Sequence, residues 1–200
     1  MPQQTLAYRI DDKLYLNITD RCTLHCHFCP KHHGTHKVHD YDLTLQHRPV
    51  TEELINAIDA PDQYREIVFC GYGEPTLRLP VLLDIAAYIK AQGGRTRLNT
   101  DGLANRVHKR DVLPELGRVI DALSVSMNAA DEAVYNKHCQ PALDNAFNSM
   151  LDFLGAAPTY ITDVTATAID GLEGVDIAAC QALATRLGVK FRRRILDIVG

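Results

Sequence analysis

Three cysteines near the start of the chain stand close enough together to hold one compact metal centre. Cys22, Cys26 and Cys29 are spaced by four and then three residues, inside the segment 21–30. Thiolates bind thiophilic metals such as zinc or the iron of an iron–sulfur cluster. A structural zinc site needs a fourth protein ligand, which His25 or His27 could supply. A cluster held by three cysteines instead keeps one iron open, and the spacing alone does not separate the two sites.

The rest of the chain predicts strands that alternate with helices. Leu14, Leu16 and Ile18 alternate with polar neighbours, as in a strand, and the cysteine loop follows at once. Further strands are predicted at residues 66–70, 96–100, 122–127, 161–169 and 190–196. A helix is predicted at residues 51–60, with Thr51 as its cap, and a short one after Asp131. The remaining helices are predicted at residues 80–92, 111–117, 142–154 and 176–187.

This order of elements predicts an α/β fold in a single domain that covers residues 1–200. Strands that alternate with helices form parallel sheets of right-handed βαβ units. About eight strands close a conventional barrel, so six predict an open, partial (β/α)6 barrel with parallel strands. Polar and apolar residues alternate along the strands at 122–127 and 161–169. The polar set is expected to line a lumen that holds a ligand.

Polar or glycine-bearing segments follow the first five predicted strands. They are the cysteine loop, Gly-Tyr-Gly-Glu-Pro at 71–75, Asn-Thr-Asp-Gly at 99–102, Ser-Met-Asn at 126–128 and Ile-Asp-Gly at 169–171. Active sites of such folds lie at the carboxyl ends of the strands. This regularity favours a cofactor site around an iron–sulfur cluster over an isolated zinc knuckle.

The cysteine segment, Cys-x3-Cys-x-Phe-Cys after a first strand, resembles the signature of the radical S-adenosylmethionine (radical SAM) superfamily. The resemblance implies that Cys22, Cys26 and Cys29 bind three irons of a [4Fe–4S] cluster and that S-adenosylmethionine (SAM) chelates the fourth. It also implies that the reduced cluster cleaves SAM to a 5′-deoxyadenosyl radical, which abstracts a substrate hydrogen. The protein would position the cofactor and exclude competing reactions. Phe28, just before the last cysteine, is expected near the adenine.

The same resemblance implies the residues that contact SAM. The segment Gly71, Tyr72, Gly73 and Glu74 is similar to the family's Gly-Gly-Glu motif, whose backbone contacts the methionyl amino group, although Tyr72 replaces a glycine. Glycine permits a close approach of the backbone to a ligand. The resemblance places further contacts, to the ribose, the adenine and the remainder of SAM, at Asn99, Ser126, Asn128, Ile169 and Gly171.

Arginines on the predicted strands indicate an anionic ligand. Arg192 and Arg194 share one face of the last strand, and Ile195, which is expected to pack under the helices, lies on the other. The two arginines, like Arg97, are then expected to point into the lumen, where an unpaired cation is costly. At least one is expected to contact the carboxylate of SAM or an acidic group of the substrate, and we assign Arg194 to the cofactor site. Asp163, on the neighbouring strand, is the alternative partner.

The other cysteines and the histidines carry weaker signals. Cys70, Cys139 and Cys180 are isolated, so they are not predicted to bind a metal. Cys70 and Cys180 are expected to be buried, and Cys139 is expected to lie exposed in a loop. Seven histidines lie between residues 25 and 47. We interpret them as a solvated loop at the active site, with a dedicated metal site as the alternative.

Composition bears on the cellular location and the binding partners of the protein. Of its 200 residues, 46% are hydrophobic and 23% are charged, as in ordinary globular domains. No apolar run reaches the length of a membrane span, and no signal peptide is evident, which predicts a cytoplasmic protein without membrane contact. The net charge of −4 argues against a nucleic-acid partner, because phosphate binding needs a concentrated basic surface.

Three functions follow from these patterns. The first is a radical SAM enzyme that acts on an unidentified small molecule with an anionic group, supplied with electrons by a reductase or a flavodoxin- or ferredoxin-type donor. The second is a radical SAM enzyme that modifies a macromolecule, similar to a glycyl-radical activase or an RNA-modifying enzyme. The third is a zinc-binding interaction module. Within the superfamily, the chain most resembles the small TatD-associated radical SAM proteins.

Overall fold

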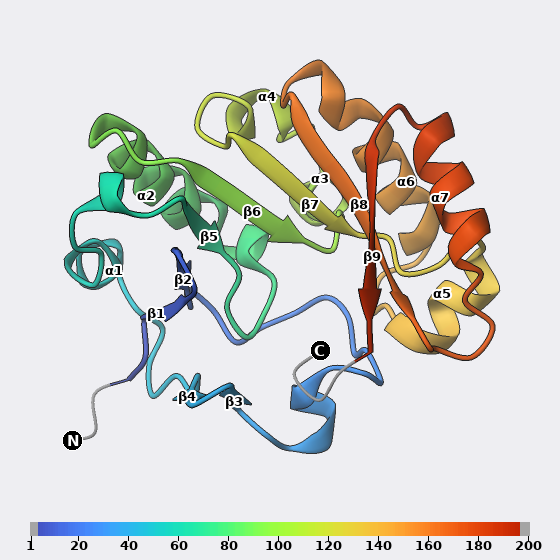
Figure 1. Ribbon diagram of the computed structural model, residues 1–200, viewed down its shortest axis with the longest axis horizontal. Helices are drawn as coiled ribbons and strands as arrows, with labels where there is room; N and C mark the ends of the chain where they lie inside the picture. The colour runs from blue at the N-terminus through green and yellow to red at the C-terminus, as the bar shows by residue number, and fades with distance from the viewer. Residues whose placement is uncertain (1–3, 197–200) are drawn as a thin grey trace.

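A seven-stranded sheet organises the computed structural model, which describes residues 4–196. The strands lie in the order β1-β2-β5-β6-β7-β8-β9 (Figure 1). From β2 onward each strand pairs in parallel with the next, whereas β1 is antiparallel to β2. The strands of this sheet are β1 (Ala7–Ile10), β2 (Lys13–Leu16), β5 (Glu66–Phe69), β6 (Thr96–Thr100), β7 (Ala122–Ser126), β8 (Asp163–Asp170) and β9 (Lys190–Ile195).

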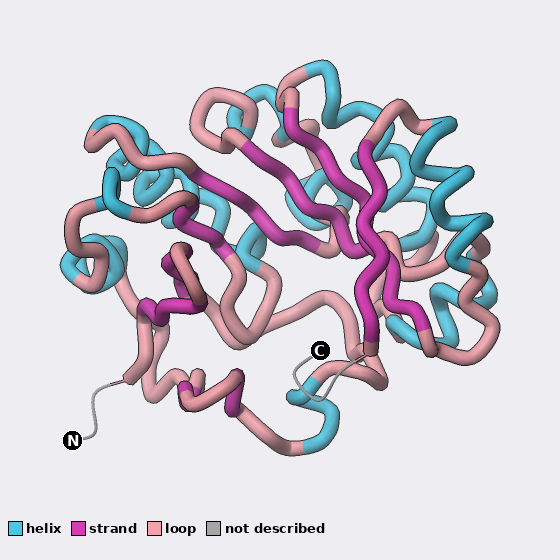
Figure 2. Tube along the Cα trace, viewed as in Figure 1, coloured by secondary structure: helices cyan, strands magenta, loops and turns pink. Residues whose placement is uncertain are grey.

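Helices connect the parallel strands and pack along one face of the sheet (Figures 1 and 2). They are α1 (Thr51–Asn56), α2 (Leu79–Ala91), α3 (Ala104–His108), α4 (Leu113–Leu116), α5 (Glu132–Cys139), α6 (Ala146–Ala156) and α7 (Ile177–Arg186). Single 3-10 turns are η1 (Pro30–His33), η2 (Pro61–Gln63), η3 (Pro75–Arg78) and η4 (Ala157–Thr159). The α/β fold and the partial, mostly parallel barrel predicted from the sequence are confirmed.

The apolar core lies between this face and the helices. Leu98, Leu123 and Val125 point from β6 and β7 into it, and Leu82 and Phe153 meet them from α2 and α6, all essentially without exposed surface. The alternation of strand side chains sends the neighbouring polar residues to the opposite face. That face is the inside of the partial barrel, and it is where the site is built.

The structure corrects several predicted boundaries. It adds β1 and α3, and a small hairpin of β3 (Lys37–Val38) and β4 (Tyr41–Asp42) inside the histidine-rich segment. The helix predicted from residue 142 begins at Ala146, because the preceding Asn145 has a left-handed backbone, with φ of 55°. Thr51 is the first helical residue of α1 and not its cap. Val50 occupies the cap position, and its N–H donates to Glu53 Oε2 at 2.8 Å.

None of the helices in residues 4–196 is both long enough and apolar enough to cross a membrane.

Candidate active site

A cavity of about 420 Å³ opens at the carboxyl ends of the central strands. The predicted site residues that line it are Cys22, Cys26, Phe28, Cys29, Gly71, Tyr72, Gly73, Glu74, Asn99, Ser126 and Asn128. The sheet register explains why they meet, since parallel strands bring their carboxyl ends to the same edge. The structure therefore gathers residues that are more than a hundred positions apart in the chain, such as Cys22 and Asn128, around the cysteine loop.

The cysteine loop runs from β2 to the hairpin and is held from the side by the last turn of α5 and the residues that follow it. His25 N donates to the carbonyl of Cys139 at 3.0 Å, and His27 N donates to that of His138 at 3.0 Å. Leu24 forms an isolated bridge with Pro141. In Figure 2 the cysteine segment is a long loop with one helical turn, η1. Its backbone is thus fixed by contacts to a distant segment and not by a regular element of its own.

The three thiols of this loop are half-buried and face the cavity. Burial, with the nearby charges of Asp101 and Glu74, raises the pKa of Cys22 to about 12. A hydrogen bond with Cys139, followed by burial, raises the pKa of Cys26 as well. Thiols bind metals as thiolates, so loading this loop with a metal must release protons. Among residues 4–196, no group of three or more His, Cys, Asp and Glu side chains is already placed to hold a metal ion.

A buried carboxylate ties this loop to the ends of β5 and β6. Glu74 is 3% exposed, and its Oε1 accepts hydrogen bonds from Thr76 N at 3.0 Å, Thr76 Oγ1 at 2.7 Å and Thr100 Oγ1 at 2.8 Å. Its Oε2 accepts from Asp101 N at 2.8 Å. Its own N–H donates to the carbonyl of Arg21, beside Cys22, at 2.8 Å. These bonds occupy the Glu74 carboxylate with protein groups and fix one wall of the cavity.

Asp101 is the second buried carboxylate of this wall. It is 5% exposed, accepts a hydrogen bond from Thr23 Oγ1 in the cysteine loop and accepts another from Leu103 N at 2.9 Å. Burial raises the pKa of both carboxyls, that of Glu74 to about 8, and the charge of Asp101 adds to the rise at Glu74. Asp101 was not among the residues predicted for the site, although the Asp-Gly at the end of β6 pointed to its neighbourhood.

Close backbone packing explains the two glycines after β5. A Cβ on Gly73 would lie 2.2 Å from the carbonyl oxygen of Arg21, and a Cβ on Gly71 would lie 2.7 Å from the Cα of Asn17. Neither glycine has a positive φ. The glycines thus allow β5 to end directly against the cysteine loop, in addition to any approach to a ligand.

Gly73→Ala is therefore expected to displace the cysteine loop, because the atom it meets is backbone and cannot rotate away. We expect a loss of about 1–3 kcal/mol in the free energy of unfolding and a lower iron content after reconstitution. Urea unfolding and iron analysis measure the two effects. Gly155→Ala is the matched control, since its Cβ would lie 3.3 Å from the flexible end of Leu187. Equal stability and equal iron in both variants would contradict this account.

Two buried amide oxygens on the cavity wall lack a hydrogen-bond partner. They are Asn99 Oδ1 and Asn128 Oδ1, each without a partner among the described residues. Asn128 has a left-handed backbone, with φ of 60°, and its N–H donates to the carbonyl of Thr167 at 2.9 Å. A buried acceptor without a donor is costly. These oxygens, together with the three thiols, fit a cofactor that carries N–H or O–H donors and a thiophilic metal.

Three of the predicted site residues do not line this cavity. Ile169 and Arg194 are paired across β8 and β9 on the inner face, and Ile169 is 1% exposed. Gly171 follows β8 with a φ of 99°, a left-handed conformation that favours glycine. They lie farther along the inner face, toward β9.

Two cysteines lie closer to the site than the sequence predicted. Cys139 was expected in an exposed loop, but it is the last residue of α5 and has no exposed surface. Its Sγ accepts from Asn128 Nδ2 at 3.4 Å, and its carbonyl accepts from the thiol of Cys26 at 3.7 Å. Tyr135 lies four residues earlier and is also buried, so a helical interpretation of 132–139 would have placed Cys139 inward. Cys70 lines the cavity itself.

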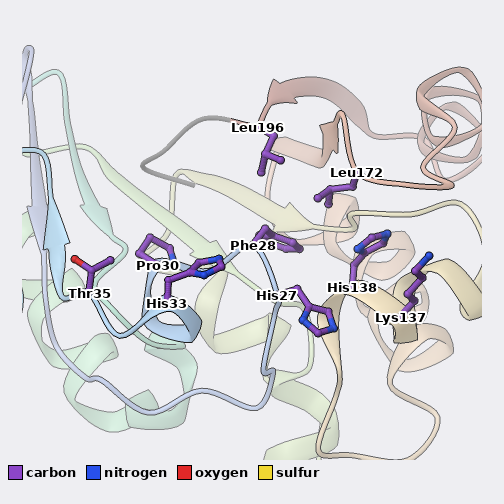
Figure 3. A pocket seen from close by; sticks show the side chains of 9 residues that line it. All are labelled: His27, Phe28, Pro30, His33, Thr35, Lys137, His138, Leu172 and Leu196. Carbon is purple, nitrogen blue, oxygen red and sulfur yellow. The ribbon is translucent and has the colours of Figure 1, made fainter.

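A second hollow of about 570 Å³ adjoins the first across the side chain of Phe28, which lines both. Figure 3 shows Phe28 at its centre, with His33 on one side and His138 on the other. Leu172 and Leu196 border it from the loop after β8 and from the end of β9. Phe28 thus separates the thiol-lined cavity from an outer hollow.

Comparison with known proteins identifies the class. A model of the radical SAM superfamily matches residues 16–185, which is most of the chain. The chain therefore belongs to the radical SAM superfamily of enzymes, whose members use SAM and an iron–sulfur cluster.

A curated relative from an archaeon is longer than this chain. The tungsten-containing aldehyde ferredoxin oxidoreductase cofactor-modifying protein of Pyrococcus furiosus is 31% identical over 123 residues, which cover 60% of this chain and 32% of that protein. The chain thus spans about a third of the length of this curated relative.

Solved structures agree in fold. SuiB of Streptococcus suis bound to the precursor peptide SuiA matches with a TM-score of 0.71 at 12% identity, over 93% of this chain and 39% of that one. TYW1 with a lysine-pyruvate adduct bound matches with a TM-score of 0.65 at 15% identity, over 93% of this chain and 65% of that one. At these identities the likeness concerns the fold.

Proposed function

We propose that this chain holds a [4Fe–4S] cluster through Cys22, Cys26 and Cys29 and binds SAM in the cavity beside them. When bound, these groups supply a 5′-deoxyadenosyl radical that abstracts hydrogen from the substrate. The observation that carries the proposal is the pair of unpartnered amide oxygens of Asn99 and Asn128 on the wall of the cavity that all three thiols line. A SAM molecule offers amino and hydroxyl donors for such oxygens.

The protein's part in this reaction is to hold the two groups in place and keep water from them. The Glu74 carboxylate bonds β5 to β6, and the backbone of Gly73 and Glu74 lies against the cysteine loop. In this proposal the backbone of 71–74 receives the methionyl part of SAM. In the same proposal Ser126 and Asn128, which line the cavity, contact the ribose, and Phe28 covers the adenine. Ile169 and Gly171 border the adenine from the end of β8.

We propose a small molecule as the substrate, with electrons from a reductase or a flavodoxin- or ferredoxin-type donor. The Pyrococcus furiosus relative is named as a cofactor-modifying protein, which supports a small-molecule substrate here. The alternative is a peptide, because SuiB has been solved with a precursor peptide bound. The octet Cys-Thr-Leu-His-Cys-His-Phe-Cys and the segment Gly-Tyr-Gly-Glu-Pro-Thr support a place in the small TatD-associated subgroup.

Anaerobic reconstitution with iron and sulfide tests the proposal. We expect a brown protein with about four iron and four sulfide per chain, and 5′-deoxyadenosine after SAM and a strong reductant are added. Metal analysis and liquid chromatography measure these results. A colourless protein that takes up zinc in place of iron would instead support the zinc-binding module, and a loaded cluster without 5′-deoxyadenosine would contradict radical formation.

A further inference from the structure

Two arginines on the inner face of β9 stand apart from the other charged residues of the barrel. Arg192 is paired with Thr167 of β8 in the sheet register, and Arg194 is paired with Ile169. The guanidinium of Arg192 reaches across β8 and donates to Ser124 Oγ of β7 at 3.4 Å. Alternation along the strand places both arginines on the face that carries the polar residues of β7 and β8. This agrees with the predicted direction of Arg192 and Arg194. Ile195, however, was expected to pack under the helices and is 70% exposed at the end of β9, so that part of the prediction was wrong.

The carboxylates of Glu66 on β5 and Asp163 on β8 already form ion pairs with other basic residues, at the opposite end of the inner face. Glu66 accepts from Arg97 Nε at 2.8 Å and from Arg97 Nη2 at 2.7 Å, and it also pairs with Arg95 at 3.3 Å. Asp163 pairs with Lys190 at 3.0 Å and with Arg95 at 3.2 Å. Arg97, which the sequence placed among the candidates for an anionic ligand, is thus held by Glu66, and it also lies 3.8 Å from Asp163, the predicted alternative partner. Glu66 was not foreseen as its partner.

Arg192 and Arg194 have no such partner. Within residues 4–196, neither guanidinium lies within 4.0 Å of a carboxylate, and Arg194 makes no side-chain hydrogen bond. Arg193, on the other face of the same strand, is paired with Asp170. Burial, followed by the positive charges of Arg194 and Arg97, lowers the pKa of Arg192. The outward arginine is neutralised, whereas the two inward arginines repel one another.

We propose that Arg192 and Arg194 form a binding site for one carboxylate or phosphate group of the substrate. Guanidinium groups present planar sets of N–H donors that match both anions, and two of them can hold one anion from two sides. Arg192 is accessible to solvent on the open side of the barrel, so a ligand can reach it. This anion site extends the proposed function and rests on it, since the bound anion is part of a substrate only if the chain is a radical SAM enzyme.

The position of the pair fits a substrate group better than the carboxylate of SAM. Neither arginine lines the thiol-lined cavity. Cys70 lines it, and both guanidinium charges lie close enough to influence the pKa of the Cys70 thiol. Burial raises the pKa of the Cys70 thiol, while the hydrogen bond with Asn99 and the charges of Arg194 and Arg192 act in the opposite direction. The arginines thus lie next to the cofactor cavity, toward β9. An anion held there would place the rest of a small molecule beside the proposed position of SAM.

Anion binding to the cluster-loaded protein tests the site. Inorganic phosphate and succinate are titrated anaerobically at low ionic strength by calorimetry, because salt screens such contacts. The wild type is compared with Arg192→Gln/Arg194→Gln and with Arg193→Gln as the matched control. We expect the double variant to bind at least one of the two anions at least about tenfold more weakly, with Arg193→Gln close to the wild type. Circular dichroism checks that each variant is folded. If the double glutamine variant does not fold, Arg192→Lys/Arg194→Lys is used in its place.

The outcomes separate the two anion sources and the two proposals. Equal affinity of the wild type and the double variant for both anions, or no binding to the wild type, overturns the site. A loss of SAM affinity in the double variant, with anion affinity unchanged, assigns the arginines to the carboxylate of SAM and also overturns it. If wild-type protein forms no 5′-deoxyadenosine while anion binding depends on both arginines, the cofactor proposal fails and the anion site stands.

Discussion

A Cys26→Ala variant is expected to retain almost no iron after reconstitution and to release no 5′-deoxyadenosine. Cys26 is the middle one of three thiols on one loop, and its thiol donates to the carbonyl of Cys139 at the end of α5, which also holds this loop in place. Two remaining thiols cannot hold a cluster that leaves one iron open for SAM. Iron and sulfide analysis, with chromatography of the products, measures both losses.

Cys180→Ala is the matched control for this experiment. Cys180 is fully buried in α7, away from the cavity, so its replacement removes a thiol without touching the loop. We expect iron and 5′-deoxyadenosine close to wild type in that variant. Full iron retention in Cys26→Ala, or equal losses in both variants, would remove Cys26 from the ligand set.

The stability of the metal-free protein is expected to fall as the pH rises from about 5.5 to about 8.5. Burial raises the pKa of Glu74 to about 8 in the folded protein, above its ordinary value of 4.5. Between these two values the folded state binds more protons than the unfolded state, so the free energy of unfolding decreases with increasing pH. Asp101, which is also buried with a raised pKa, acts in the same direction.

Glu74→Gln isolates this contribution, because glutamine does not ionise. Across the same pH interval we expect the wild type to lose on the order of 2 kcal/mol more unfolding free energy than the variant. Urea unfolding at the two pH values measures the difference. Glu173→Gln is the control, since Glu173 is a surface residue whose pKa is lowered by Lys137. Parallel pH dependence of Glu74→Gln and wild type would show that Glu74 keeps its charge in the fold.

Local patterns predicted the strands of the barrel well. The alternation in 96–100 predicted β6 with the bounds that the structure shows, and the run at 66–70 predicted β5 to within one residue. Parallel register then brings Asn99, Ser126 and the cysteine loop to one edge, so a correct strand order was sufficient to gather them. β1 was missed because its four residues show no strand pattern of their own and form a strand by pairing with β2.

The contacts that hold the site together could not be predicted in the same way. Gly73 faces the backbone of Arg21, and Glu66 pairs with Arg97, across separations in sequence that no local periodicity encodes. Cys139 was placed wrongly because the Gln-Pro that follows it indicated a loop, while the packing of α5 against α6 buries it. The residue types of the loop were sufficient to predict its chemistry, whereas the contacts that hold the loop in place depend on tertiary packing.

The position of β9 at the end of the sheet has a consequence for self-association. Within the described residues, its outer edge forms no strand pairing, and Ile195 there is 70% exposed. An uncovered edge of this kind is a template for strand addition by a second copy, which natural sheets oppose with charge. Arg192 and Arg194, which no carboxylate in residues 4–196 neutralises, supply that charge, since two such edges brought together would face each other with like signs. Apolar replacements on β9 would therefore remove a barrier to edge-to-edge aggregation together with the anion site, and high ionic strength would weaken the same barrier in the wild type.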